Sequence, residues 1–174
     1  MKRFKIFIAL SAVAFFCVSS RAYMQQRPLY EIHSMLLYNF IKYIEWPASD
    51  KTGDFVIGVI GDENVYNALN KWYGTKTKGT QKIIIKKFDG ALDVTKCHVV
   101  YIASKKSNEF DLVKNIASGQ HILIVTDKPG LGKKGSNINF KMVNGKLKFE
   151  LNKSSIEKSQ LKVSSQLEKM AIII

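Results

Sequence analysis

Three short, unbroken apolar runs constrain the fold of this 174-residue chain more than any other feature of its sequence. They occupy residues 55–60, 98–103 and 122–125. A strand with one face in water alternates apolar and polar residues, whereas a strand covered on both faces is apolar throughout. Doubly covered strands are typical of parallel sheets that carry helices on either side. The three runs therefore predict an α/β protein.

Segments with helical periodicity alternate with these strands. Apolar residues spaced by three or four predict a first helix over residues 29–46, which Pro47 should end because proline disfavours helical geometry in the residue before it. Asp62 is suited to cap a second helix that runs to about Tyr73. Another strand is predicted over residues 82–88 and a third helix through residues 110–116. Right-handed crossovers would place these helices on both faces of the sheet.

The pattern changes in the last third of the chain. Residues 138–143 and 147–151 are predicted strands on either side of Asn144 and Gly145, and Asn-Gly between two strands is a strong hairpin signal. A final helix is expected over residues 164–170, with its last residue, Met170, facing inward. We therefore predict a three-layer α/β domain, with a mainly parallel sheet, helices on both faces and an antiparallel C-terminal hairpin at one edge.

The N-terminus has the three parts of a signal peptide. Basic residues precede an apolar run of thirteen residues, 6–18, and a small residue, Ala22, stands where cleavage is expected. Thirteen residues are too few for a helix across a bilayer core of roughly 30 Å, which takes about 20. We predict a signal peptide over residues 1–22 and one exported domain over residues 23–174, located in a bacterial periplasm. The alternative is an uncleaved N-terminal anchor.

The chain is strongly basic, with a formal net charge of +13. Loss of residues 1–22 removes four basic residues and leaves +9 on the mature chain. Such a balance favours an anionic partner or surface, although it is also compatible with ordinary solvated charge. Nucleic acid is not an expected partner, because the chain is exported and has no repeat of basic and aromatic residues.

Cysteine use limits the role of disulfides. Only Cys97 remains after cleavage, so the mature chain cannot form an intrachain disulfide. This residue opens an apolar run, and we predict that it is a buried thiol. An intermolecular disulfide is the alternative in an oxidising compartment.

Polar residues follow three of the predicted strands, at Asp62, Ser104 and Asp127. In open α/β sheets, ligands bind in the crevice outside the carboxyl ends of the strands. The three residues therefore form a candidate ligand crevice. The simpler alternative is that Asp62 only caps a helix and Asp127 only forms a turn.

The sequence contains no motif that predicts a catalytic, cofactor or metal site. Residues 58–61 lack the spacing of a dinucleotide fingerprint. Residues 130–135 lack the spacing of a phosphate loop and are predicted to be a flexible turn. His33, His98 and His121 share no metal-ligand spacing. We therefore expect no enzymatic activity, no cofactor and no metal.

Four stretches of the mature chain are similar to the YfiR-like family of periplasmic proteins, and they occur in the family's order. They are MLLYNFIKYIEWP at residues 35–47, FVIGVIGDENVYNAL at residues 55–69, CHVVYIAS at residues 97–104, and the run from HILIVTD through GSNINFKMVNGKLKFELN to LKVSSQLEKMA at residues 121–171.

The resemblance implies a non-enzymatic regulator. The best-known family member represses an inner-membrane diguanylate cyclase by binding its periplasmic part, and an outer-membrane-linked lipoprotein sequesters that repressor. Other members are paired with membrane sensor kinases. A homodimer is a further expectation. Some members carry a cysteine pair near the late hairpin, and because residues 130–152 have none here, redox control of that kind is in doubt.

The end of the first helix supplies a candidate partner surface, formed by Tyr43, Trp46 and Pro47. Interface hot spots favour tryptophan, so Trp46 could anchor a partner. It could equally be a core residue that closes the helix against the first strand. Two functions thus stand open: a regulator that binds a membrane signalling protein, and a periplasmic small-ligand binder that uses the strand-end crevice.

Overall fold

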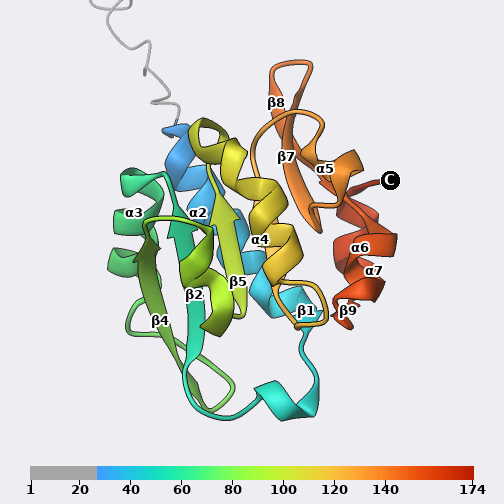
Figure 1. The fold of residues 1–174 in the computed structure, drawn as a ribbon. Coiled ribbons are helices and arrows are strands. Elements are labelled where there is room, and N and C mark those ends of the chain that lie inside the picture. Colours follow the sequence, from blue (N-terminus) through green and yellow to red (C-terminus); the bar gives the residue numbers. More distant parts are fainter. Residues whose placement is uncertain (1–26) are drawn as a thin grey trace, which may run out of the picture.

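The computed structural model describes residues 27–174, so the predicted signal peptide lies outside the described residues. Figure 1 shows a sheet with helices on both sides. The helices are α2 (Leu29–Tyr43), α3 (Glu63–Tyr73), α4 (Phe110–Ile116), α5 (Leu131–Lys134), α6 (Lys153–Lys158) and α7 (Ser165–Met170), with 3-10 helices η1 (Ala48–Asp50), η2 (Ala91–Lys96) and η3 (Ser104–Glu109). The strands are β1 (Ile44–Glu45), β2 (Phe55–Ile60), β3 (Thr77–Lys78), β4 (Gln81–Phe88), β5 (Val99–Ile102), β6 (Leu123–Thr126), β7 (Ile138–Val143), β8 (Lys146–Leu151), β9 (Lys162–Val163) and β10 (Ile172–Ile173).

The main sheet has eight strands in the order β10-β8-β7-β6-β5-β2-β4-β3. Strands β4, β2, β5, β6 and β7 are parallel, and β8 folds back antiparallel to β7. At the two edges, β10 pairs with β8 and β3 pairs with β4. Strands β1 and β9 form a separate two-stranded antiparallel sheet. The α/β prediction, with its mainly parallel sheet and C-terminal hairpin, is confirmed.

Each face of the sheet packs against its own set of helices. Alternate residues of a strand point to opposite faces, so Ile57 belongs to the core cluster shared with α2 and α3, whereas Val56 belongs to the cluster shared with α4 and η2. We call these the first and the second core cluster. Buried members of the first include Leu37, Phe40, Tyr101 and Phe140, and buried members of the second include Ile60, Val94, Val100 and Phe110.

Every helix described between residues 27 and 174 is too short or too polar to cross a membrane.

The first helix ends earlier than predicted. It stops at Tyr43 rather than at Trp46, because Ile44–Glu45 leaves the helix to pair with Lys162–Val163 of β9. Carbonyl groups at the C-terminal end of α2 have no partner within the helix. The ammonium group of Lys78 donates hydrogen bonds to two carbonyl oxygens there, those of Ile41 and Ile44. The end of α2 is therefore set by a long-range strand pairing, which the local sequence does not predict, and not by Pro47.

Two expectations for the C-terminal third are wrong in detail. The predicted flexible turn contains the short helix α5, which begins after Gly130 and ends before Gly135, and both glycines are in the left-handed backbone region that glycine adopts without strain. Met170 is 49% exposed instead of facing inward. Helix α7 has only six residues and buries Leu167 as its single core contact.

Candidate functional site

The strand order places a switch point between β2 and β5. The chain leaves β2 toward β4 on one side and later returns to β5 on the other, and in open α/β sheets ligands bind outside the carboxyl ends of the strands at such a point. Ile60, Ile102 and Thr126 are register partners across β2, β5 and β6. The residues that follow these three, including Asp62 and Asp127, therefore lie along one edge of the sheet.

Asp62 has a structural task at this edge. Its carboxylate oxygen Oδ1 accepts hydrogen bonds from the backbone N–H groups of Asn64, at 2.9 Å, and Val65, at 3.1 Å. These bonds satisfy donors at the first turn of α3 that would otherwise have no partner. Ser104 is exposed and begins η3. The capping role predicted for Asp62 is thus confirmed.

The side chain of Lys106 packs against the backbone at the end of β2. Gly61 adopts a positive φ of 81°, and a Cβ atom at this position would lie 2.5 Å from Cγ of Lys106. The lysine stem therefore packs directly on the glycine. The polar contacts at this edge of the sheet lie on its β5–β6 side, next to Asp127.

A buried polar cluster lies on that side, formed by His33, Tyr101 and Asp127. The Tyr101 hydroxyl donates to Oδ2 of Asp127 at 2.8 Å, and Nδ1 of His33 is 3.2 Å from the same hydroxyl oxygen. His33 comes from α2, is 3% exposed and stacks on Phe140 of β7 with ring centroids 4.3 Å apart. Three elements distant in the sequence therefore build one hydrogen-bonded chain.

One histidine tautomer is compatible with both hydrogen bonds when Tyr101 donates to Asp127. Because the Tyr101 proton is donated to Asp127, Nδ1 of His33 must carry a hydrogen and donate it to the phenol oxygen. Burial lowers the pKa of His33, although the Asp127 and Asp62 charges oppose this, and burial together with Asp127 raises the pKa of Tyr101. The histidine and the tyrosine are therefore both neutral near pH 7.

Two atoms of the cluster lack a hydrogen-bond partner among the described residues. They are Nε2 of His33 and Oδ1 of Asp127, and both are buried. With Nδ1 protonated, both atoms are acceptors, so a water or ligand that donates O–H or N–H groups would satisfy them. Buried polar groups in native proteins are nearly always paired, which makes this the most unusual polar feature of the described chain.

The sequence predicts a polar site at Asp127 but not its two companions. His33 lies on the predicted first helix without metal-ligand spacing, and Tyr101 lies inside an apolar run whose neighbours are all core residues. The sequence signals that indicate them are a polar group on an otherwise apolar helix face and a tyrosine one residue before the end of a buried strand. Within the described chain, no group of three His, Cys, Asp or Glu side chains is placed to hold a metal ion.

The other candidate residues lie at the end of α2. Trp46 is 3% exposed, its indole N–H donates to the carbonyl oxygen of His121 at 2.9 Å, and its ring meets Phe55 edge-on. The ring is therefore part of the core cluster between the sheet and α2. Tyr43 and Pro47 are half-buried.

A groove of about 570 Å³ lies beside Trp46 and Pro47, between η1 and α6, and we call it the Trp46 groove. Leu161 adds a third apolar contact to its wall, while Glu157 and Lys162 bring charges of both signs. The structure thus brings Trp46 and Pro47 together at one concave surface. Tyr43 lies three residues earlier, at the end of α2, where its carbonyl accepts the backbone N–H of Ser164.

Cys97 is a buried thiol, as the sequence predicts. Its Sγ donates to the carbonyl oxygen of Val94 at 3.3 Å, and burial raises the pKa of the thiol to about 12. A thiol in this state is a poor nucleophile near neutral pH.

Comparison with known proteins gives one family match. A family model described as YfiR/HmsC-like matches residues 30–172. No curated protein matches the chain.

Two solved structures share its fold at low sequence identity. A conserved domain protein from Vibrio cholerae O1 biovar El Tor is 11% identical, with a TM-score of 0.56, and the match covers 83% of this chain and 60% of that one. The ABC domain from Streptococcus pneumoniae, solved in complex with L-Trp, is 10% identical, with a TM-score of 0.50 and coverage of 69% and 55%. The chain thus spans less than two thirds of either protein.

Proposed function

Because the chain belongs to the YfiR/HmsC-like family, we propose that it is a periplasmic, non-enzymatic regulator that binds the periplasmic part of an inner-membrane signalling protein. A diguanylate cyclase is the first choice of partner, and a sensor kinase is the alternative. The observation that carries this proposal is the family match, which extends over residues 30–172 and so spans almost all of the described fold.

The proposal includes export of the chain. A signal peptide over residues 1–22, cleaved near Ala22, would deliver residues 23–174 to the periplasm as a single domain. The support is the basic start, the short apolar run and the small residue at the expected cleavage position. N-terminal sequencing of the protein recovered from a periplasmic extract tests this step, and a chain that still begins at Met1 would contradict it.

We place the partner contact at the Trp46 groove and the adjacent Tyr43. Concave surfaces with an apolar wall and charges of both signs at the rim are suited to receive a protein segment. Trp46 and Pro47 form part of that wall, and Tyr43 extends the surface along α2. Since Trp46 is also a core residue, a variant that tests the groove should change an exposed neighbour instead.

The test combines a pull-down with a cellular readout. Tagged protein is recovered from detergent-solubilised envelope, the inner-membrane proteins that co-purify are identified, and cyclic di-GMP is measured in the same cells. Ala48→Glu introduces a charge at an exposed residue that lines the groove. Ser49→Glu is the matched control, because it adds the same charge at the next exposed position of η1.

We expect Ala48→Glu to lose the inner-membrane partner and to raise cyclic di-GMP, while Ser49→Glu behaves as the unchanged protein. Recovery of a sensor kinase without any change in cyclic di-GMP would support the alternative partner. If neither a cyclase nor a kinase co-purifies, the regulator proposal fails. The same pull-down also tests two further proposed partners, an outer-membrane-linked lipoprotein and a second copy of the chain.

A second candidate function rests on the His33–Tyr101–Asp127 cluster. Its two unpartnered acceptors, at the carboxyl ends of the strands, favour a small ligand that donates hydrogen bonds. Native mass spectrometry of the protein purified from the periplasm would detect such a ligand as a bound mass. Asp127→Asn should remove that mass, whereas Asp54→Asn, at an exposed aspartate before β2, should retain it.

A further inference from the structure

The end of the β7–β8 hairpin stands clear of the rest of the sheet. Strand β7 pairs with β6 only at residues 138–139, and β8 pairs with β10 only at residues 150–151. Beyond these points the two strands pair with each other as far as Val143 and Lys146, and no other described strand lies beside them. Figure 1 shows this part of the hairpin extending past the neighbouring strands. We call residues 140–149 the hairpin ribbon.

One face of the hairpin ribbon is apolar. Register partners in an antiparallel pair lie on the same face, and the next pair along the strands points to the other face. Phe140 and Phe149 are partners and are buried against Phe40 of α2. Met142 and Leu147 are the next pair on this face toward the turn, and Leu147 packs against the first core cluster. Met142 is 55% exposed, so the apolar row leaves the core and ends in a methionine that contacts solvent.

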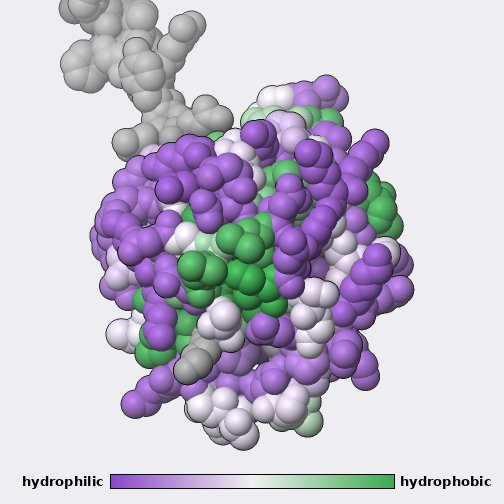
Figure 2. Space-filling view, viewed as in Figure 1, coloured by the Kyte–Doolittle hydropathy of each residue, from purple (hydrophilic) through white to green (hydrophobic). Residues whose placement is uncertain are grey.

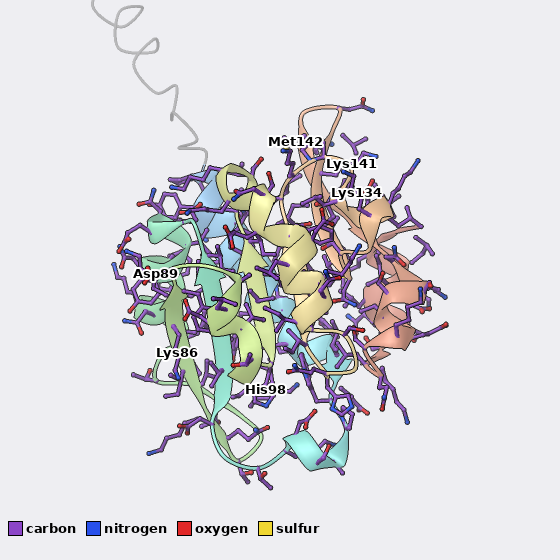
Figure 3. All side chains as sticks on the ribbon, in the orientation of Figure 1. Lys86, Asp89, His98, Lys134, Lys141 and Met142 are labelled. Carbon is purple, nitrogen blue, oxygen red and sulfur yellow. The ribbon has the colours of Figure 1, made fainter. Side chains whose placement is uncertain are left out.

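The opposite face of the hairpin ribbon is basic. Lys141 and Lys148 are register partners on this face, and Lys146 follows beside the turn. All three are exposed, and among the described residues only Lys141 has an ion-pair partner, Glu150 at 2.9 Å. Helix α5 contacts β7, and its Lys134 is labelled next to Lys141 in Figure 3. The ribbon therefore carries exposed ammonium groups on one face and an exposed apolar side chain on the other.

The nearby carboxylates do not offset this charge at the end of the ribbon. Residues 138–149 contain no aspartate or glutamate. Glu150 lies at the base, and its side chain, 5% exposed, already accepts hydrogen bonds from two side chains of β7. Asp127, at the end of β6, accepts a hydrogen bond within the buried cluster, and Glu31 in the first turn of α2 is accompanied by Arg27. The C-terminal carboxylate follows β10, which runs parallel to β8 and so leads away from the turn.

We propose that the hairpin ribbon docks the domain on the surface of a bilayer that contains anionic phospholipid. Met142 would enter the boundary between headgroups and acyl chains, while the lysines of the opposite face would reach the lipid phosphates. Each lysine near an anionic membrane surface raises the affinity about fivefold. The basic character of the whole chain favours the same surface.

The size of the ribbon favours a lipid surface over a protein partner. A standard protein interface takes about 20–30 residues from each side, many more than the ribbon contains. A narrow amphipathic element can instead bind a membrane by shallow insertion of an apolar side chain between basic residues. The ribbon and the Trp46 groove share no residue, so this contact goes beyond the proposed function and does not depend on its partner.

Co-sedimentation with vesicles tests the proposal on the protein recovered from a periplasmic extract. One set of vesicles contains phosphatidylglycerol and phosphatidylethanolamine, and the other contains phosphatidylcholine alone. We expect the protein to bind the anionic vesicles and to dissociate as the salt concentration rises, because salt screens exposed charges. Binding to the neutral vesicles should be about tenfold weaker or more.

Two double variants separate the ribbon from the net charge of the chain. Lys146→Gln with Lys148→Gln should weaken binding to the anionic vesicles about thirtyfold, since two lysines are neutralised. Lys82→Gln with Lys86→Gln is the matched control, because it removes the same charge from two exposed positions of β4, on the other side of the sheet (Figure 3). All four lysines are exposed, so both variants should unfold at the urea concentration of the unchanged protein.

A methionine pair tests the apolar part of the contact. Met142→Gln should weaken binding to the anionic vesicles about fivefold, because an apolar side chain that would leave water is lost. Met170→Gln is its control, since Met170 is 49% exposed and lies on α7. It should bind as the unchanged protein does.

Three results would overturn the proposal. They are equal binding to the two sets of vesicles, equal losses in the two lysine variants, and equal losses in the two methionine variants. If the Lys146 and Lys148 variant kept its vesicle binding and lost a protein from the pull-down, the ribbon would be a protein-binding surface instead, and the proposal would also fail. The vesicles contain no protein, so a failure to bind them leaves the regulator proposal untouched.

The exposed apolar surface over η2 and α4 is distinct from the ribbon. Figure 2 shows it as an apolar patch surrounded by hydrophilic surface. Leu92 of η2 is 78% exposed, but exposed acidic residues, Asp89 and Asp93, lie close to it in the sequence. The hairpin ribbon, which has no acidic residue of its own, is therefore the better match for an anionic surface.

Discussion

Replacing Tyr101 by phenylalanine measures how much the hydrogen bonds of the His33–Tyr101–Asp127 cluster contribute to the free energy of unfolding. The change keeps the ring in the core and deletes one hydroxyl, which accepts from His33 and donates to Asp127. After the deletion, Nδ1–H of His33 has no partner in a side chain that is only 3% exposed. An unmade hydrogen bond of a buried polar group costs about 1–3 kcal/mol. Asp127, whose side chain is 18% exposed, regains some of its loss from water.

The lost partner of His33 and the lost donor to Asp127 together predict a decrease of roughly 2–4 kcal/mol in the free energy of unfolding. For a domain of this size, each kcal/mol lowers the melting temperature by roughly 2–4 °C. Urea unfolding at pH 7, followed by the fluorescence of Trp46 and Trp72, measures the change. Tyr38→Phe is the control, because Tyr38 is half-buried, and it should change stability by less than about 0.5 kcal/mol.

A double-mutant cycle with Asp127→Asn completes the test. If Tyr101 and Asp127 interact as the 2.8 Å hydrogen bond indicates, the two changes should be coupled by about 0.5–3 kcal/mol. Additive effects within about 0.3–0.5 kcal/mol would refute the reasoning, since independent sites are additive to that precision. A loss below about 1 kcal/mol for Tyr101→Phe alone would show that water replaces the hydroxyl at little cost.

Three more predictions follow from named contacts. Burial lowers the folded-state pKa of His33 and of His98 below the ordinary value of 6.5. The free energy of unfolding should therefore fall as the pH drops from 7.5 through 6.5 toward the folded-state pKa values. Urea titrations at several pH values should show a smaller pH dependence for His33→Gln. Gly58→Ala would put a Cβ 2.0 Å from Cε2 of Phe88 and should cost about 1–3 kcal/mol in urea unfolding, part of which the second change Phe88→Leu restores. Trp46→Phe removes the hydrogen bond to His121 and leaves a gap, so it should cost about 2–4 kcal/mol by calorimetry, against less than about 1 kcal/mol for the half-buried Trp72.

The sheet could be predicted because most of its strands have local sequence patterns that identify them. Unbroken apolar runs identify β2, β5 and β6, and Asn144–Gly145 identifies the β7–β8 hairpin. The early end of α2 could not be predicted, since it depends on β9, more than a hundred residues later in the chain. Helix α5 could not be predicted either, because the glycines on both sides of it favour a loop and Leu131 is buried only in the tertiary fold.

The candidate site was only partly visible in the sequence for the same reason. Asp127 follows a buried strand, and its place at the sheet edge comes from a general rule for α/β folds. His33 and Tyr101 acquire their meaning only when α2 is laid against β5 and β7, a packing that no local pattern encodes. For Trp46 the sequence identifies the residue but not its role. Its helix-end position suggested two roles, and only the packed structure reveals that the ring itself is buried.

The pairing of β1 with β9 has a consequence for how the domain assembles. Contacts between residues 44–45 and 162–163 join the first part of the domain to the last, and β10 adds a strand from the final residues. Closing so long a loop is entropically costly before its contacts repay it, and chains dominated by distant pairings fold slowly. The C-terminal end of α2 therefore gains its last neighbours only after nearly the whole chain is available. Until then, the apolar residues around Trp46 are exposed to contact with other chains, as is general for apolar surface that is buried late in folding.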